Sequence, residues 1–249
     1  MRIDYPSSEQ IPALRCLWQE AFGDDDRFLD AFFDHAYSPL RCRSITKDGR
    51  LAAALYWFDC TWQDKKVAYL YAVATAADFR GQGLCRALME DTHSLLCSAG
   101  YAGAVLVPGT KTLFSLYGKL GYTTLSCADT LTCTAGKPVY LRKIDTAEYD
   151  ALRRAFLSKN DIILGVEDSR FLSSVWQLYA GNRWVLAAFD KGKALVGMEF
   201  LGDASALPGI LAALGKQKGT FRLPGNKPFA MYKPLVSPGT PEWFGLAFD

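Results

Sequence analysis

The sequence lacks the features that would place a protein in a membrane, on a nucleic acid or around a metal ion. It contains no apolar run approaching the roughly 18 residues that a membrane-spanning helix needs. Its formal net charge is +2, and no run of Lys or Arg concentrates positive charge. Neither a nucleic acid nor an anionic membrane is therefore a predicted partner. The histidines are His35 and His93, and we expect structural or surface roles for both and no metal site.

The cysteines form neither a metal-binding spacing nor a disulfide framework. Their number is odd, and all lie within the first 133 residues. They read as small buried hydrophobes in a reducing compartment, and the first residues do not resemble a secretory signal. We therefore expect a cytoplasmic protein. The seven are Cys16, Cys42, Cys60, Cys85, Cys97, Cys127 and Cys133.

A glycine-containing loop is the most informative stretch that is present. An apolar strand is predicted over residues 68–74, and a helix begins just after the loop that contains Gly81 and Gly83. The unpaired N–H groups of such a helix N-terminus point in one direction, and the helix dipole adds to their attraction for an anion. The glycines allow close approach of the backbone, and Arg80 and Arg86 add positive charge. The loop is therefore predicted to bind a pyrophosphate.

Two other kinds of phosphate-binding loop do not fit. A dinucleotide fingerprint needs a third glycine three positions after Gly83, where the chain has Arg86. It also needs an acidic residue about twenty positions further on, where residues 104–106 are Ala-Val-Leu. The Gly-Lys-Ser/Thr of a Walker loop is absent from the sequence.

Cys85 has two interpretations in this context. A thiol at a helix N-terminus beside Arg86 can have a lowered pKa and become reactive. Alternatively, Cys85 packs beneath the loop as a small apolar residue.

The loop resembles motif A of the GNAT N-acetyltransferases, Arg/Gln-x-x-Gly-x-Gly/Ala, which residues 80–85 match as Arg-Gly-Gln-Gly-Leu-Cys. Cys85 departs from the pattern, because Gly or Ala is usual there. The Gly-Leu-x-Arg ending over residues 83–86 is more similar to the branch of enhanced-intracellular-survival-type acetyltransferases. A second GNAT signature, Tyr followed by Lys-x-Gly-Phe/Tyr, is matched from Tyr117 to Tyr122. Both signatures in this order form a more specific signal than either alone.

The resemblance implies an α/β (α+β) fold, the GNAT acyltransferase fold with a mixed, mostly antiparallel sheet, and acetyl-CoA as co-substrate. It implies that the strand beside the loop holds the pantetheine, with an amide of Val73 to Thr75 directed at the thioester carbonyl. It further implies that Tyr117 protonates the departing thiolate, although a core aromatic is the alternative for Tyr117. Tyr122 is expected to be a packing residue. The cofactor-binding residues implied are Val73, Ala74, Thr75, Arg80, Gly81, Gln82, Gly83, Leu84, Cys85 and Arg86.

The general base is less clearly marked. The central strand offers Tyr69 and Tyr71 but no carboxylate, where many GNAT enzymes have Glu. Asp59, near the end of the preceding predicted strand, is either a candidate base or a solvated strand end. In the enhanced-intracellular-survival-type enzymes the C-terminal carboxylate is the base. The apolar tail over residues 243–248 would allow Asp249 to serve in the same way, or would simply dock on the surface.

Residues 1–133 are predicted to form an acyl-CoA-binding GNAT domain. Half of the 249 residues are apolar, which is enough for one or two domains with sizeable cores. The order of elements follows from apolar periodicity and from helix caps and turns. The predicted elements are helices from Ser7 to Gly23 and from about residue 24, strands over 41–46, 51–60 and 67–74, a helix over 84–99, a strand over 104–107, a helix over 111–121 and a strand over 122–133.

Residues 134–138 break the pattern and form a candidate linker. Residues 138–249 are predicted to form a degenerate GNAT-like domain with a C-terminal tail, because their element order echoes that of the first half. Their loop over residues 202–205 carries Asp203, which would repel a phosphate, so we expect one cofactor per chain. The predicted elements are helices over 145–158 and 168–180, strands over 184–189 and 194–201, a helix over 205–214, and strands over 220–223 and 229–235.

These features predict an acetyl-CoA-dependent N-acetyltransferase that moves an acetyl group directly to a primary amine of a small molecule or peptide. Within the same fold, the alternatives are another acyl donor and aminoacyl or peptidyl transfer. In a different class, a catalytically silent module would bind acyl-CoA and regulate a partner. The sequence is also compatible with an oligomer.

The acceptor site has only weak candidates. Four acidic residues would attract a cationic amine or would simply cap a helix, and four tryptophans would line a pocket or belong to the core. They are Asp24, Asp25, Asp26 and Asp30, and Trp57, Trp62, Trp176 and Trp243.

Overall fold

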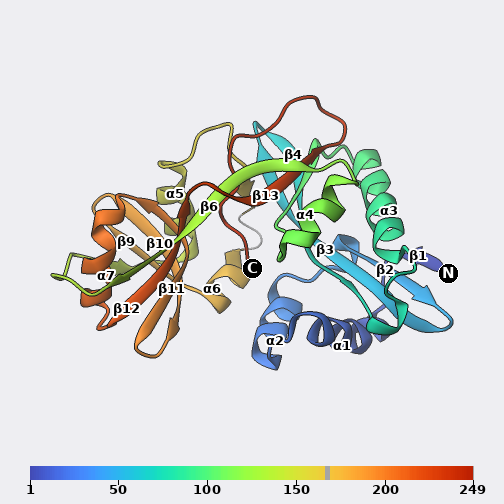
Figure 1. Ribbon diagram of the computed structural model, residues 1–249, viewed down its shortest axis with the longest axis horizontal. Coiled ribbons are helices and arrows are strands. Elements are labelled where there is room, and N and C mark those ends of the chain that lie inside the picture. The colour runs from blue at the N-terminus through green and yellow to red at the C-terminus, as the bar shows by residue number, and fades with distance from the viewer. Residues whose placement is uncertain (166–168, 249) are drawn as a thin grey trace. The chain divides into compact units, whose positions relative to one another are not determined.

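A computed structural model describes residues 1–165 and 169–248 (Figure 1). The chain divides into two compact units. The first unit consists of Met1–Thr123 and Met231–Thr240, and the second of Thr124–Ala230 with the tail that begins at Pro241. Within the described residues, no helix combines the length and apolarity that crossing a bilayer demands.

The first unit is built on one sheet in the order β1-β2-β3-β4-β5-β13, in which only β4 and β5 pair in parallel. Its helices are α1 (Ile11–Phe22), α2 (Asp26–His35), α3 (Leu84–Ser98) and α4 (Lys111–Gly118). Its strands are β1 (Arg2–Asp4), β2 (Cys42–Lys47), β3 (Arg50–Trp62), β4 (Lys65–Thr75), β5 (Gly103–Leu106) and the end of β13 (Lys227–Pro234).

Aromatic residues hold α1 and α2 against one face of this sheet. Tyr56 on β3 and Tyr71 on β4 are cross-strand partners, so their rings point to the same face. The Trp18 ring of α1 lies 5.2 Å from Tyr56 and 4.6 Å from the Phe32 ring of α2, measured between centroids. The helix α3 packs on the other face, where Arg43 of β2 forms an ion pair with Asp91. These contacts fix the positions of β4 and α3, which form the candidate site.

Most elements predicted for the first half are confirmed. The helix α1 ends at Gly23 in the left-handed conformation, and Asp25 caps α2 by accepting a hydrogen bond from the Phe28 amide at 2.9 Å. The hairpin turn at Asp48 and Gly49 is also present. The short strand β1 was not predicted, because three residues are too few to show a periodicity.

The second unit contains a sheet in the order β6-β12-β11-β10-β9-β7, in which only β11 and β12 pair in parallel. The helix α7 connects those two strands, as α3 connects β4 and β5 in the first unit. The helices of the second unit are α5 (Thr146–Arg154), α6 (Ser169–Val175) and α7 (Leu207–Ala213). Its strands are β6 (Thr123–Thr134), β7 (Arg142–Lys143), β8 (Ile163–Leu164), β9 (Gln177–Gly181), β10 (Trp184–Lys191), β11 (Ala194–Gly202) and β12 (Lys218–Pro224).

One predicted helix of the second half is wrong beyond Val175. Residues 177–181 form the strand β9, which pairs with β10. Tyr179 continues the helical spacing of Phe171 and Val175 in the sequence, which explains the prediction. Tertiary pairing with β10 satisfies the backbone of this segment and overrides the local pattern.

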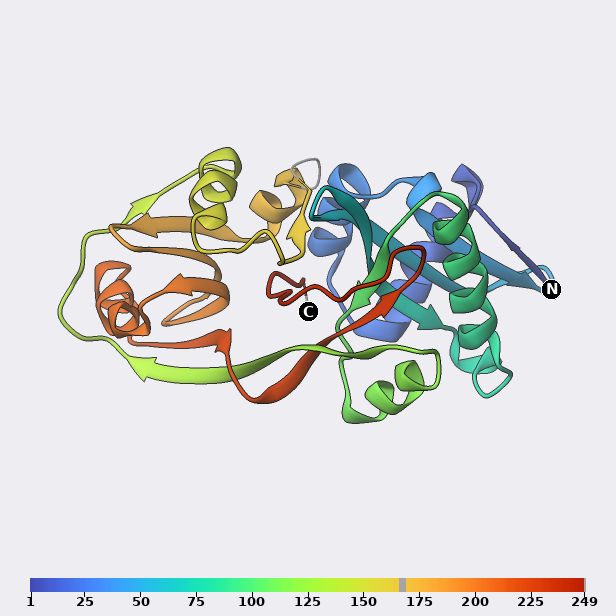
Figure 2. The ribbon, with the colours of Figure 1, turned by 90° about the horizontal axis from the view of Figure 1, so that it is seen from above.

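Each sheet is completed by a strand from the other half of the chain. β6 follows the first-half helix α4, yet it pairs with β12 from Thr134 opposite Lys218 to Ala128 opposite Pro224. In the first unit, Met231–Pro234 of β13 pair with β5. Residues 124–134 thus lie in the second unit, although the sequence boundary assigned residues up to 133 to the first domain. Both pairings can be followed in the ribbon (Figure 2).

Candidate functional site

Gly81 and Gly83 adopt the backbone conformation expected of the predicted pyrophosphate-binding loop. We call this loop, with the N-terminus of α3 that follows it, the glycine cradle. Their φ angles are +74° and +76°, in the left-handed region that non-glycine residues rarely adopt. A Cβ atom built on either glycine would meet nothing within 4 Å, so open space lies beside the loop. Gly83 is the N-cap of α3, and no described side chain caps that end. The free N–H groups of the first turn can therefore bind an anion.

Positive charge around the loop comes partly from residues that the sequence analysis missed. The Arg80 Nε donates to the Thr75 carbonyl at 3.0 Å, and Lys47 donates to the Gln82 side chain. Arg50 pairs with Asp78 at 2.9 Å. Lys47 and Arg50 flank the turn between β2 and β3, and nothing local in the sequence indicates that this turn meets the loop.

The three residues that open α3 differ in what they offer. Leu84 is buried, so only its backbone can face a ligand. Burial raises the pKa of the Cys85 thiol above its usual value, which disfavours the reactive thiolate and supports a packing role. Arg86 is half-exposed and lies 3.7 Å from Glu90 one turn along the helix.

β4 carries a bulge at the position expected to face the thioester. Ala54 pairs with Ala74 and Tyr56 with Tyr71, so two residues of β4 lie opposite one residue of β3. One of the two, Ala72, has a φ of +48°, which is a strained conformation for a non-glycine residue. The bulge redirects the backbone amides that follow it, at Val73 and beyond.

The pairing of β4 with β5 ends before the bulge. Their parallel register covers Val67–Tyr69 and Gly103–Val105, and β5 then ends at Leu106 while β4 continues to Thr75. Val73 and Thr75 are half-buried, whereas Ala74 between them is buried. The edge of β4 after Tyr69 therefore has no partner in β5. This edge, which we call the unpaired edge of β4, belongs to the same unit as the glycine loop.

Tyr117 lies at the C-terminal end of α4, in a Schellman motif. The Tyr122 amide donates to the Tyr117 carbonyl at 3.1 Å, and the Gly121 amide donates to the Gly118 carbonyl at 3.1 Å. Gly121 has a φ of +89°, as the C′ position of this motif requires. The motif also places a side-chain contact between its first and last residues, and the Tyr117 and Tyr122 ring centroids are 5.9 Å apart. The second sequence signature is thus a helix cap that holds Tyr117.

The alternative base Asp59 lies away from the bulge. It is opposite Ala68 in the register of β3 and β4, roughly 13 Å along the strand from Ala72 at about 3.3 Å per residue. Its carboxylate accepts a hydrogen bond from the Tyr101 hydroxyl, and Arg41 lies 3.8 Å away. Because Tyr101 and Arg41 already contact the Asp59 carboxylate, a structural role near the end of β3 is favoured over the role of general base.

Asp249 lies outside the described residues, but the tail that leads to it is anchored in the second unit. Phe244 and Phe248 are buried. The Ser126 hydroxyl donates to the Phe244 carbonyl at 2.7 Å, and Arg222 donates to the Ala247 carbonyl at 3.1 Å. The Phe248 ring lies 4.7 Å from the Phe171 ring between centroids. The tail is therefore bound up to its penultimate residue.

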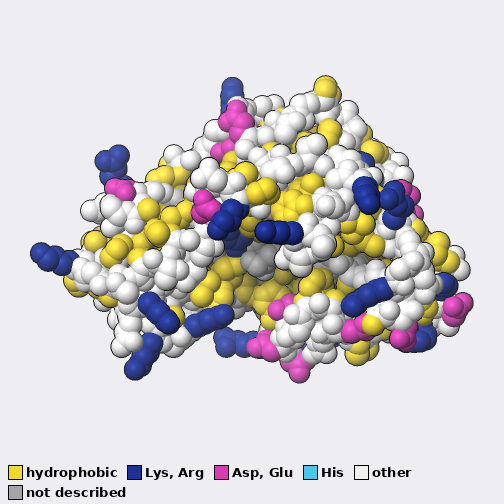
Figure 3. Space-filling model, viewed as in Figure 1, with side chains coloured by type: hydrophobic (Ala, Val, Ile, Leu, Met, Phe, Trp, Pro, Cys, Tyr) yellow, Lys and Arg dark blue, Asp and Glu magenta, His cyan; other side chains and the backbone are white. Residues whose placement is uncertain are grey.

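The acidic candidates for an acceptor site already serve the first unit. Asp24 accepts a hydrogen bond from the Trp18 indole at 2.8 Å, Asp25 caps α2, and Asp30 pairs with Arg15 at 2.7 Å. Such contacts support the capping interpretation over an acceptor-binding one. Among the tryptophans, Trp57, Trp62 and Trp176 are buried and Trp243 is half-buried. On the face shown in Figure 3, acidic and basic side chains lie together at the right of the view, whereas basic side chains alone lie along the lower left edge.

The second unit has no equivalent of the glycine cradle at the corresponding loop. Asp203 accepts a hydrogen bond from the Ser205 amide at 2.9 Å, so a carboxylate already occupies the start of this turn. The same hydrogen bond lowers the pKa of Asp203, which keeps the carboxylate negatively charged. A second anion there would meet electrostatic repulsion.

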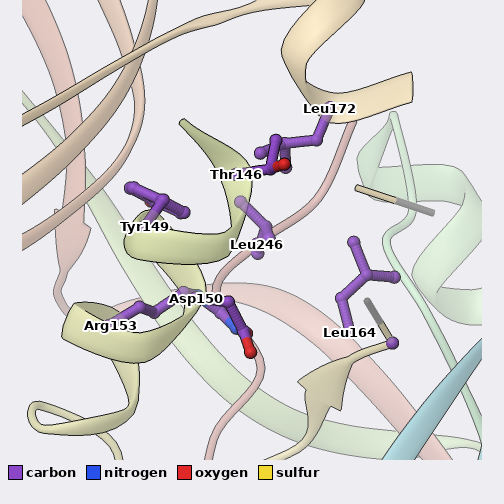
Figure 4. Close-up of a pocket in the computed structure, with 8 residues that line it drawn as sticks. Thr146, Tyr149, Asp150, Arg153, Leu164, Leu172 and Leu246 are labelled. Atoms are coloured by element: carbon purple, nitrogen blue, oxygen red, sulfur yellow. The ribbon is translucent and has the colours of Figure 1, made fainter. Parts of the chain in front are cut away.

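A buried ion pair in the second unit is a feature that sequence reasoning missed. Arg153 of α5 and Glu199 of β11 form a two-pronged contact at 2.6 and 3.0 Å, and Tyr149 donates to Glu199 at 2.8 Å. A small pocket beside α5 is lined by this arginine and tyrosine together with Asp150, Thr146 and leucines of neighbouring segments (Figure 4). In the sequence, Glu199 is a single acidic residue within an apolar strand, and no local pattern indicates that Arg153 is its partner.

Comparison with known proteins tests the family. Residues 2–125 match a family model described as an acetyltransferase (GNAT) domain. A search of curated proteins finds no match.

Solved structures are similar to this chain over nearly its whole length. A GCN5-related N-acetyltransferase from Kribbella flavida has a TM-score of 0.69 at 14% identity, covering 94% of this chain and 71% of that one. One from Anabaena variabilis ATCC 29413 has a TM-score of 0.69 at 14% identity, covering 95% and 73%. Eis1 from Mycobacterium abscessus has a TM-score of 0.65 at 9% identity, covering 95% and 74%. At these identities the likeness concerns the fold. The family match identifies residues 2–125 as a GNAT acetyltransferase domain, and the protein is an acyltransferase.

Proposed function

We propose that this enzyme transfers an acetyl group from acetyl-CoA directly to a primary amine. The observation that carries the proposal is the presence, in one unit, of a left-handed glycine pair at a helix N-terminus, a bulged strand with an unpaired edge, and a capped tyrosine. Each part supplies one requirement of thioester aminolysis, namely binding, carbonyl polarisation and leaving-group protonation.

In the proposed mechanism the N–H groups at the start of α3 bind the pyrophosphate, with Arg80 and Arg86 nearby. The backbone amides of residues 73–75 stabilise negative charge on the thioester oxygen. The amine forms the new C–N bond, and the C–S bond then breaks. Tyr117 gives its proton to the sulfur. A phenol with a pKa near ~10 can protonate a thiolate whose acid has a pKa near ~8.5 when the two are held close.

The base in this proposal is the C-terminal carboxylate of Asp249, which takes a proton from the acceptor ammonium and so frees the nitrogen lone pair for the attack. Support comes from the resemblance to the enhanced-intracellular-survival-type enzymes, in which the C-terminal carboxylate is the base. We also propose that one acetyl-CoA binds per chain, since Asp203 occupies the corresponding turn of the second unit.

The first experiment is an assay of CoA thiol release with a panel of primary amines and of acyl-CoA chain lengths. Deleting Asp249 is expected to lower kcat roughly tenfold at pH 7, because the new terminal carboxylate, on Phe248, is set back by one residue, about 3.5 Å of chain, from the position of the proposed base. The loss should shrink as pH rises and the amine deprotonates unaided. The matched control is Asp249→Asn, which keeps the terminal carboxylate and removes only the side-chain charge, so it should stay active. Tight acetyl-CoA binding without thiol release for any amine would instead support a silent acyl-CoA-binding module.

The cradle makes a separate prediction. The change Gly83→Ala should raise the Kd of acetyl-CoA at least about tenfold, because a methyl group enters the open space where the pyrophosphate is proposed to lie and the left-handed backbone is strained. The matched control is Gly100→Ala, since Gly100 also has a positive φ of +78° and open surroundings but lies at the other end of α3. Calorimetry should show the weaker binding only for Gly83→Ala. Equal Kd values for both variants would contradict the assignment of the cradle.

A further inference from the structure

A buried histidine on α3 contacts the motif that holds Tyr117. The His93 Nε2 atom and the Tyr122 hydroxyl share a hydrogen bond of 2.8 Å. His93 is 7% exposed and Tyr122 is 3% exposed. From the sequence, His93 is expected to be a structural or surface residue and Tyr122 a packing residue. The structure adds that the two side chains form one polar contact inside the first unit.

Tyr122 is linked to Tyr117 through both backbone and ring. As the last residue of the Schellman motif, Tyr122 donates its amide to the Tyr117 carbonyl. The two rings meet edge to face, with an interplanar angle of 63°. Lys233 of β13 also donates to the Leu120 carbonyl in the same turn. The position of the Tyr117 ring therefore depends on where the Tyr122 ring is held.

Both partners of the hydrogen bond stay uncharged at neutral pH. Burial, aided by the positive charge of Lys233, lowers the pKa of His93 to about 4. Burial and the neighbouring Tyr117 raise the pKa of Tyr122 well above its usual value. A neutral imidazole and a neutral phenol form a directional contact with no ion to solvate, which suits an orienting role.

We propose that His93 and Tyr122 are positioning residues that orient Tyr117 toward the leaving sulfur. This inference rests on the proposed role of Tyr117 as general acid. The helix α3 begins at the glycine cradle and carries His93 in its third turn. In this proposal the same helix therefore positions the cofactor phosphates at its N-terminus and, through His93 and Tyr122, the Tyr117 side chain. Orientation of this kind affects the chemical step more than binding, because the cradle itself is unchanged.

The test compares two variants of His93. The change His93→Leu removes the hydrogen bond and should lower kcat by roughly ten- to a hundredfold, while the KM of acetyl-CoA stays within about threefold. The conservative change His93→Gln offers a side-chain nitrogen and oxygen near the Nε2 position and should recover most of kcat. Tyr122→Phe should resemble His93→Leu. The matched control is Thr92→Val, because Thr92 is buried on the same helix and its hydroxyl donates to the Leu88 carbonyl one turn earlier.

A double variant separates this inference from the proposed function. If His93 acts through Tyr117, adding His93→Leu to Tyr117→Phe should cause little further loss of kcat. Independent, multiplicative losses would overturn the positioning role, as would a His93→Leu loss matched by Thr92→Val. A Tyr117→Phe variant with full activity would instead remove the acid from the proposed function. Circular dichroism before each assay should show that every variant is folded, and a loss of kcat that only follows unfolding would also overturn the inference.

Discussion

Replacing Tyr117 with Phe is expected to lower kcat by roughly 10²–10⁴-fold, the range in which a positioned general acid contributes. The change removes one hydroxyl. The ring contact with Tyr122 and the backbone bonds of the Schellman motif remain, so the fold of α4 should persist. The Kd of acetyl-CoA should change little, because the cradle at Gly81 and Gly83 is untouched. Thiol release under saturating acetyl-CoA, together with direct binding measurements, gives the two quantities.

A buried tyrosine elsewhere in the first unit provides the control. Tyr101 is buried, and its hydroxyl bonds to Asp59. Tyr101→Phe thus removes a hydroxyl of the same kind away from the bulge, and kcat should be retained. Similar kcat values for Tyr117→Phe and the unchanged chain would show that Tyr117 is a core aromatic.

Replacing Arg153 with Met is expected to destabilise the protein by about 3–5 kcal/mol, the usual cost of leaving one buried charge without its partner. The Arg153 and Glu199 side chains are 2% and 3% exposed. Glu199 also accepts a hydrogen bond from the Tyr149 hydroxyl. That single neutral donor cannot compensate the desolvation cost of a buried carboxylate. Equilibrium urea unfolding followed by tryptophan fluorescence measures the difference in free energy of unfolding.

The neighbouring arginine on the same helix is the matched control. Arg154 pairs with Asp150 at 2.7 Å across one helical turn, and its side chain is 44% exposed. Arg154→Met should cost only about 0.3–0.5 kcal/mol, because a solvated pair contributes little. A loss for Arg153→Met as small as that for Arg154→Met would contradict the assignment of Arg153 as a desolvated charge.

A combined replacement tests the cause. Changing all three partners to apolar residues of similar size, as Arg153→Met, Glu199→Leu and Tyr149→Phe together, should recover much of the lost stability. Such a replacement removes the charges along with their desolvation cost. If the triple variant were as unstable as Arg153→Met alone, poor packing rather than an uncompensated charge would account for the loss.

The parts of the candidate site that could be predicted are those built from neighbours in the chain. A strand, two glycines and a helix start lie within a short segment, so the left-handed φ angles of Gly81 and Gly83 follow from residue type and local order. The cap that holds Tyr117 is equally local, since Gly121 provides the conformation that ends α4.

The parts that escaped prediction join residues distant in sequence. Lys47 reaches the glycine loop only because the β2–β3 turn folds onto it. The bulge at Ala72 depends on how β4 aligns with β3, and no residue type in the strand demands it. Asp59 was a reasonable candidate base by sequence, but the register places it at the other end of the strand. Register is set by pairing and packing, which a single strand does not encode.

By itself, the sequence determined the order of most elements, the glycine cradle, the capped tyrosine and the GNAT resemblance, because caps, turns and apolar periodicity act over a few residues. Only the tertiary structure decided that β6 completes the second sheet and β13 the first, that His93 meets Tyr122, and that Arg153 meets Glu199. Each of these contacts forms between segments that are distant in sequence and are buried together. Such burial exists only once the chain has folded.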